Sequence, residues 1–126
     1  MIVVKKENCD ILKHGKAIYG VPDMVVEVLS KSTRKRDVTV KKDAYEANGV
    51  KEYWIVDTKY KSIDVYVLHD GKFKFDNEYI FYSEDDVEWF HMSADDRAAV
   101  KSEISLSIFP DLTVKLSDIF SWGYDF

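Results

Sequence analysis

The chain has 126 residues, of which 46% are hydrophobic and 33% are charged, and its formal net charge is −5. This composition is typical of one folded globular domain and excludes a disordered chain. No apolar run approaches the roughly 20 residues that a membrane-spanning helix needs, and the first residues lack a signal-peptide pattern. The lone Cys9 excludes an internal disulfide. We therefore expect a cytoplasmic protein with no membrane partner.

The charge is unevenly distributed along the chain. Residues 1–51 contain 11 Lys and Arg against 7 Asp and Glu, a balance of +4. Residues 52–126 contain 7 against 16, a balance of −9. The acidic total argues against a nucleic-acid binder, whereas the basic first half carries the positive charge that such a surface needs.

The first half predicts two strands separated by an irregular segment. Residues 1–6 are predicted as a strand, and residues 7–20 show little periodicity. Met24–Leu29, which follows Pro22, is an almost continuous apolar run. Such a run is typical of a strand buried on both faces in the middle of a sheet.

A helix and a further buried strand follow. The helix is predicted over residues 34–48, and Asn48-Gly49 supplies its C-terminal stop. Residues 53–56 form the next strand. Two strands joined by a helix of this length are expected to be parallel neighbours linked by a right-handed crossover.

The second half predicts antiparallel structure. Residues 63–67 and 73–82 are expected to pair as a hairpin around Asp70-Gly71. Residues 84–96 are acidic and are expected to form a loop or edge. The remaining predictions are a strand over 100–104, a short strand over 113–116 and a capped final turn over 117–120.

One carboxylate, Glu27, stands between Val26 and Val28 in the most apolar predicted strand. Burying a lone carboxylate costs several kcal/mol unless it is paired or binds a cation. A carboxylate beside a metal ion and a lysine can also activate water for phosphodiester hydrolysis. Glu27 is therefore a candidate catalytic residue.

The candidate lysine is Lys41, on the predicted helix. Asp37, Lys41 and Tyr45 share one face of that helix, because they are spaced four residues apart. A helix that joins two parallel strands lies over the strand that precedes it, so we expect Lys41 to reach toward Glu27. The alternative is a solvated Asp37–Lys41 ion pair, which would contribute only tenths of a kcal/mol.

The residues of this region also resemble a known family in their order. They are Pro22 to Thr33 (PDMVVEVLSKST), Arg36-Asp37, Lys41, Tyr45, Gly49-Val50 and Glu52 to Asp57 (EYWIVD). This ordered set resembles the "Uma two" family of restriction-endonuclease-like proteins. The resemblance is close over residues 20–57 and continues loosely to Asp118-Ile119-Phe120.

The family is similar to the PD-(D/E)XK nucleases, whose core is a helix, an antiparallel three-strand meander, a helix and a parallel strand. The resemblance thus implies a restriction-endonuclease-like α/β fold, an α+β mixed sheet in which a β-α-β crossover precedes antiparallel strands. Glu27 matches the acidic residue on the third core strand of the family. Leu29 stands where a lysine is usual, and Lys41 matches the helix position to which that lysine has moved. By this resemblance Glu27 and Lys41 are catalytic, Glu27 is a Mg²⁺ ligand, and DNA is the substrate.

The resemblance also implies a longer N-terminal portion, with a first helix, a first strand and a metal-binding aspartate in a Pro-Asp pair. We therefore expect residues 1–126 to form a single truncated domain that lacks the first helix and first strand and holds about half of a nuclease site. Asp23 is a poor substitute, because it lies four residues before Glu27, about 13 Å away at ~3.3 Å per residue. One Mg²⁺ with ligands at about 2.0–2.1 Å cannot bridge that gap.

Other charged clusters have weaker interpretations. Lys31, Arg34, Lys35 and Arg36 form either a phosphate-binding cluster or a solvated helix start, and their unfavourable position on the helix dipole slightly favours binding. No metal-ligand spacing is found among the histidines, and the acidic pairs are expected to be solvated. These residues are His14, His69, His91, Asp85-Asp86 and Asp95-Asp96.

Two functional hypotheses follow. The first is a metal-dependent endonuclease-like domain that acts on DNA phosphodiesters and is incomplete or inactive as this chain. The second is a non-catalytic dimerisation or regulatory module derived from the nuclease fold. An exposed sheet edge would then pair with a second copy to form a homodimer, and the acidic second half favours this alternative.

Overall fold

The computed structural model describes residues 1–8, 20–29, 35–83 and 85–120. Within these ranges, five strands form one sheet in the order β1-β2-β3-β4-β5. Their bounds are Ile2–Val3 (β1), Met24–Leu29 (β2), Glu52–Asp57 (β3), Ser62–His69 (β4) and Lys72–Ile80 (β5). β2 and β3 are parallel, and the other neighbouring strands are antiparallel. The predicted mixed α/β fold is confirmed.

Helix α1, Lys35–Ala47, connects the two parallel strands. The helix ends at Asn48-Gly49, where Gly49 adopts the left-handed conformation with φ +81°. A glycine adopts this conformation without the steric cost that a Cβ atom brings. The predicted strand–helix–strand unit is therefore confirmed, and it places α1 beside β2.

The predicted hairpin is formed by β4 and β5. Asp70 and Gly71 make its two-residue turn with φ values of +51° and +77°. Positive φ at both central positions is the signature of a type I′ turn, whose twist matches that of the strands. The hairpin extends the sheet away from β2.

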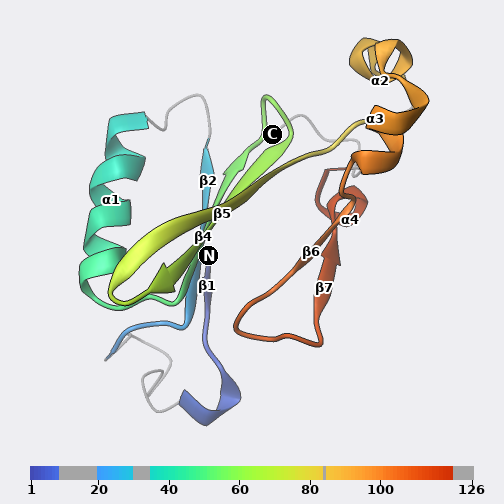
Figure 1. The fold of residues 1–126 in the computed structure, drawn as a ribbon. Helices are drawn as coiled ribbons and strands as arrows, with labels where there is room; N and C mark the ends of the chain where they lie inside the picture. The colour runs from blue at the N-terminus through green and yellow to red at the C-terminus, as the bar shows by residue number, and fades with distance from the viewer. Residues whose placement is uncertain (9–19, 30–34, 84, 121–126) are drawn as a thin grey trace.

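Two layers cover the sheet, as Figure 1 shows. α1 lies against one face, and the C-terminal segment with β6 (Glu103–Ser105), β7 (Thr113–Lys115) and α4 (Leu116–Phe120) lies against the other. The buried apolar core joins the sheet to this C-terminal segment. Its members are Met24, Val26, Trp54, Val56, Ile63, Val65, Tyr79, Ile104, Leu106, Ile108, Leu116 and Phe120. Because the main core lies on that side, the α1 face can carry polar groups.

The acidic region after β5 corrects one prediction. Residues 84–96 were expected to be loop or edge, but this region contains α2 (Val87–His91) and the start of α3 (Ala94–Ala99). The Ser93 side chain caps α3 by accepting a hydrogen bond from the Asp96 amide at 3.1 Å. Carboxylates in a first helical turn interact favourably with the helix dipole, so an acidic segment suits such short helices. None of the helices in the described ranges is long and apolar enough to cross a membrane.

Three strand predictions also need correction. β1 contains only Ile2 and Val3 of the predicted strand 1–6, because the chain turns where the Lys5 amide donates to Asp23. β6 starts at Glu103, so the strand predicted over 100–104 begins too early. β2 is buried on both faces only over Met24–Val26, and Val28 is 50% exposed. β1 pairs with just the first two residues of β2, so within the described ranges the far end of β2 has a strand partner on its β3 side only.

Candidate active site

The structure brings together Glu27, Lys41 and Tyr45 on the α1 face of the sheet. Tyr45 Oη donates a hydrogen bond to Glu27 Oε1 at 2.8 Å, and Lys41 Nζ lies 3.7 Å from the same oxygen. Lys41 and Tyr45 stand one helical turn apart, so both side chains project toward β2. The predicted approach of Lys41 to Glu27 is confirmed. The side chain of Asp37 lies outside the described residues.

The side chains of Glu27 and Lys41 differ in exposure. The Glu27 side chain is 21% exposed and the Lys41 side chain is 54% exposed. The carboxylate therefore lies at the margin of the sheet, within reach of solvent, and not in the middle of the core. A partly exposed carboxylate can take a ligand from solution, as a site must.

A second tyrosine packs against the ring of Tyr45. Tyr53 on β3 is fully buried, and its ring meets the Tyr45 ring edge-on, with centroids 5.3 Å apart and an interplanar angle of 90°. Burial, the hydrogen bond to Glu27 and the charge of Glu27 raise the pKa of Tyr45 to about 12. Burial, then the charges of Glu27 and Tyr45, also raise the pKa of Tyr53. Both phenols stay protonated at neutral pH, so Tyr45 remains a donor.

The sequence pattern predicts that Tyr45 shares a helix face with Lys41, but it does not predict the contact that Tyr45 makes. The signal was the spacing itself, because a residue four positions after Lys41 must point the same way. What the spacing could not show was which oxygen the hydroxyl would reach. The role of Tyr53 had no sequence signal beyond its place in an apolar strand.

Asp23 has a different environment from Glu27. It is 5% exposed, and its carboxylate accepts hydrogen bonds from the Lys5 amide at 2.7 Å and from Asn8 Nδ2 at 2.9 and 3.2 Å. Lys51 Nζ lies 4.0 Å from the carboxylate. Asp23 therefore secures the turn after β1, as expected of a residue that does not join the candidate site.

These contacts predict a pH dependence of stability. Burial raises the pKa of Asp23, but the hydrogen bonds from Lys5 and Asn8 and the charge of Lys51 outweigh it, so the pKa lies below its ordinary value of 3.8. A carboxyl whose pKa is lower in the folded state stabilises the protein fully above the unfolded value. That contribution is lost as the pH falls through the folded value.

We expect Asp23→Asn to be less stable than the parent protein at neutral pH and to lose less stability between about pH 5 and pH 2. Urea unfolding followed by circular dichroism across this range measures both effects. Asp111→Asn, a change at an exposed position, is the matched control. An unchanged pH dependence in Asp23→Asn would show that the Asp23 contacts do not stabilise the fold.

Glu27 is the carboxylate that would contribute to a metal site on this face. No group of three or more His, Cys, Asp or Glu residues suited to a metal ion occurs in the described part of the chain. Asp64 lies in the same cross-strand row as Glu27, but two strands away, which is about 10 Å at ~4.8 Å per strand. Mg²⁺ is often held by one or two carboxylates together with waters and substrate phosphates. Glu27 fits the role of one such ligand, although no group of three protein ligands surrounds it among the described residues.

The remaining predicted clusters stand apart from Glu27 or lie beyond what is described. Lys31 and Arg34 lie outside the described residues, as does His14, and Lys35 and Arg36 are described only as backbone at the start of α1. Whether this cluster binds phosphate therefore stays a prediction. Asp95 and Asp96 are exposed on the first turn of α3.

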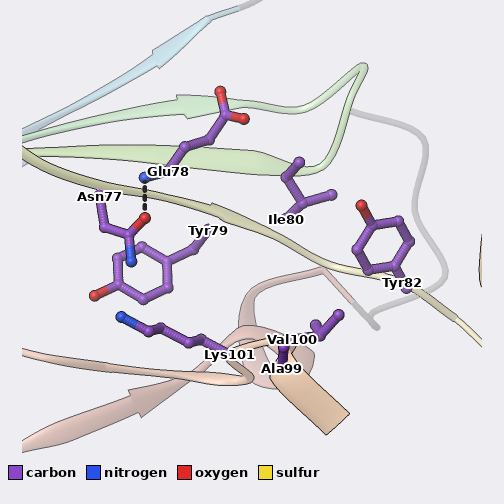
Figure 2. Close-up of a pocket in the computed structure, with 8 residues that line it drawn as sticks. All are labelled: Asn77, Glu78, Tyr79, Ile80, Tyr82, Ala99, Val100 and Lys101. Atoms are coloured by element: carbon purple, nitrogen blue, oxygen red, sulfur yellow. Dashed lines mark hydrogen bonds between the residues drawn. The ribbon is translucent and has the colours of Figure 1, made fainter. Parts of the chain in front are cut away.

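A pocket of about 280 Å³ lies between β5 and the segment that joins α3 to β6 (Figure 2). In Figure 2 the Lys101 side chain extends toward the Tyr79 ring. Tyr79 belongs to the core on the sheet face opposite α1. The pocket is therefore separate from the Glu27 group.

Three comparisons with known proteins bear on this geometry. A model of the Uma two family (Uma2, described as "Putative restriction endonuclease") matches residues 1–89. The fold matches a crystal structure described as "a putative nuclease belonging to DUF820" from Anabaena variabilis ATCC 29413, with a TM-score of 0.53 and 17% sequence identity. That match covers 96% of this chain and 54% of the other, so this chain spans about half the length of the solved protein. No curated protein matches the chain.

The family match includes β1 to β5 and α1, and therefore all three residues of the Glu27 group. The structural match shows the fold alone at this level of identity. Together with the order of residues from Pro22 to Asp57, these findings establish that the chain belongs to the Uma two family of restriction-endonuclease-like proteins.

Proposed function

We propose that this chain is a metal-dependent endonuclease-like domain that acts on DNA phosphodiesters, with Glu27 and Lys41 as its catalytic residues. The observation that carries the proposal is the contact of Glu27 with Lys41 and Tyr45 in a chain of this family. A surface ion pair alone would be a weak reason, because such pairs are common. Three further observations strengthen the proposal. Lys41 and Tyr45 contact the same oxygen of Glu27, the buried Tyr53 packs against Tyr45, and the chain belongs to this family.

The chemistry of each group suits phosphodiester hydrolysis. Negative charge grows on the phosphate oxygens as water attacks the phosphorus, and an ammonium group nearby stabilises it. Lys41 is exposed enough to approach a phosphate. Glu27 Oε2 has no hydrogen-bond or ion-pair partner among the described residues, so it is the atom that would bind Mg²⁺. A bound Mg²⁺ polarises a phosphoryl oxygen and lowers the pKa of an attacking water.

The number of metal ligands at the site determines how fast we expect the chain to cleave DNA. Since the described residues bring one metal ligand to the site, we propose that this chain cleaves DNA slowly on its own. The test is nicking of supercoiled plasmid by excess protein in Mg²⁺, in Mn²⁺ and in EDTA, followed for a day. Slow nicking that needs the divalent ion supports the proposal. Absence of nicking under all conditions would contradict it and favour the non-catalytic alternative.

The alternative, a dimerisation or regulatory module, has one observation in its favour. β1 is an edge strand of the sheet within the described ranges, and Ile2 is 40% exposed. Met1 exchanges backbone hydrogen bonds with Val26 of β2, and the Val3 carbonyl accepts one from the Asp23 amide just before β2. The backbone groups of Ile2 between them therefore point toward the open edge, where a second copy could pair.

This alternative predicts a dimer that depends on that edge. Ile2→Pro removes the outward-pointing amide and leaves the hydrogen bonds of Met1 and Val3 to β2 in place. Sedimentation analysis should then show a dimer for the parent protein and a monomer for Ile2→Pro, with Ile2→Val as the control that stays dimeric. A parent protein that is monomeric at all concentrations would exclude dimerisation through this edge.

A further inference from the structure

We propose that Tyr45 is the positioning residue of the candidate site: its hydroxyl holds Glu27 in place, while Lys41 remains free to move to the substrate. The catalytic consequence of this inference rests on the proposed function. The positioning of Glu27 by Tyr45 does not depend on the proposed function, and it can be measured separately.

The two partners of Glu27 Oε1 differ in the strength of their contacts. The Tyr45 hydrogen bond is 2.8 Å long and joins a phenol to a carboxylate. Hydrogen bonds to an ionised acceptor are among the stronger ones in proteins. Lys41 Nζ lies at 3.7 Å, on a side chain that is 54% exposed. An ion pair of that length at the surface contributes little, because water screens it.

The two partners also differ in how firmly they are anchored. The Tyr45 ring packs edge-on against Tyr53, which is fully buried. The Tyr45 carbonyl accepts a hydrogen bond from the Val50 amide at 3.1 Å, which fixes the end of α1 near the start of β3. A tyrosine has two side-chain torsions, and packing restricts both. Lys41 has a flexible four-carbon side chain with solvent around it.

This difference implies a division of roles. When a phosphate approaches, the Lys41 ammonium can turn from Glu27 to the phosphate oxygens at small cost. Glu27 then keeps its orientation through the hydrogen bond from Tyr45 to Oε1, and Oε2 keeps the position from which it would bind a metal ion. Without the Tyr45 hydroxyl, the Glu27 side chain would lose its firm partner, and among the described residues Lys41 would be the remaining group to hold it.

The direct test is the mobility of the Glu27 side chain, measured by NMR relaxation of its labelled methylene groups. We expect Tyr45→Phe, which keeps the ring against Tyr53, to make Glu27 mobile. Lys41→Met should leave Glu27 as ordered as in the parent protein. Tyr60→Phe removes a hydroxyl from a tyrosine that is 67% exposed, and serves as the matched control. An ordered Glu27 in Tyr45→Phe, or equal loosening by Lys41→Met, would overturn the inference.

Kinetics supply the second readout. In single-turnover cleavage with varied protein concentration, Tyr45→Phe should lower the maximal rate about tenfold, as expected when a charged group loses a hydrogen bond, and leave the half-saturating concentration within about twofold. A merely structural defect would lower thermal stability and the fraction of active protein instead. An unchanged maximal rate in Tyr45→Phe would overturn the inference. If the parent protein does not cleave, the proposed function fails, and the NMR measurement alone decides whether Tyr45 positions Glu27.

Discussion

Replacing Glu52 with alanine is expected to lower the free energy of unfolding by about 3–5 kcal/mol. The Glu52 side chain is 1% exposed and accepts three hydrogen bonds. Trp54 Nε1 donates at 2.5 Å, the Ser107 amide at 2.7 Å and Ser107 Oγ at 2.6 Å. Removal of the carboxylate leaves the buried Trp54 Nε1 without an acceptor, which costs about 1–3 kcal/mol. The two donors of Ser107, an exposed residue, lose bonds to a charged acceptor, which are stronger than neutral ones.

The effect should be large because Glu52 connects two layers of the fold. It lies at the start of β3, whereas Ser107 belongs to the segment between β6 and β7. The contact therefore holds the C-terminal layer against the sheet, beside the core residues Leu106 and Ile108. Loss of the contact should loosen that layer first.

Urea unfolding followed by circular dichroism measures the free energy of unfolding of each variant. Glu52→Gln keeps an acceptor oxygen and should lose roughly half as much stability as Glu52→Ala, because charge-assisted bonds become neutral ones. Glu88→Ala, at an exposed position on α2, is the control and should change stability by less than about 0.5 kcal/mol. A loss below about 1 kcal/mol in Glu52→Ala would show that the buried carboxylate does not join the layers.

The second large effect is expected from Lys41→Ala, which should reduce cleavage about a hundredfold or more. The ammonium group lies 3.7 Å from Glu27 Oε1 and is the nearest cation to the candidate metal ligand in the described part of the chain. Its loss removes the charge that would stabilise the phosphate during attack. DNA binding should also weaken, with the salt dependence reduced by about one counterion.

Lys42→Ala is the matched control on the same helix. Lys42 Nζ lies 3.9 Å from the centre of the Tyr66 ring, on the side of α1 that faces β4. Removal of Lys42 changes the net charge by the same amount but leaves the Glu27 group intact. Gel-shift titrations at several salt concentrations and plasmid nicking compare the two variants. Equal losses of DNA binding and of nicking in the two variants would mean that Lys41 acts only through overall charge.

The Glu27–Lys41 contact could be predicted because it depends on local rules. Residues four apart share a helix face, and the helix of a β-α-β unit packs over its first strand. An acidic residue in an apolar run and a lysine on that helix face are therefore brought together by topology alone. Tyr45 followed the same rule, but the rule fixes direction and not hydrogen-bond partners.

Other features had no local signal. Glu52 stands just before the strand predicted over residues 53–56, and its partner Ser107 lies 55 positions later, so the sequence around Glu52 could not show that it is buried. The acidic region after β5 was misjudged because α2 and α3 contain 5 and 6 residues, too few for a clear helical period. β1 was predicted too long because the bond from the Lys5 amide to Asp23 depends on a contact across 18 positions.

Cleavage by Glu27→Gln tests most directly whether Glu27 is the catalytic carboxylate. Glutamine keeps the size of the side chain and an oxygen that can accept from Tyr45, but it removes the charge that would bind Mg²⁺ and pair with Lys41. Supercoiled plasmid is incubated with excess parent protein, Glu27→Gln or the surface control Glu88→Gln in Mg²⁺. We expect divalent-ion-dependent nicking by the parent protein and by Glu88→Gln, and none by Glu27→Gln. Nicking by Glu27→Gln at the rate of the parent protein would contradict the assignment of the site.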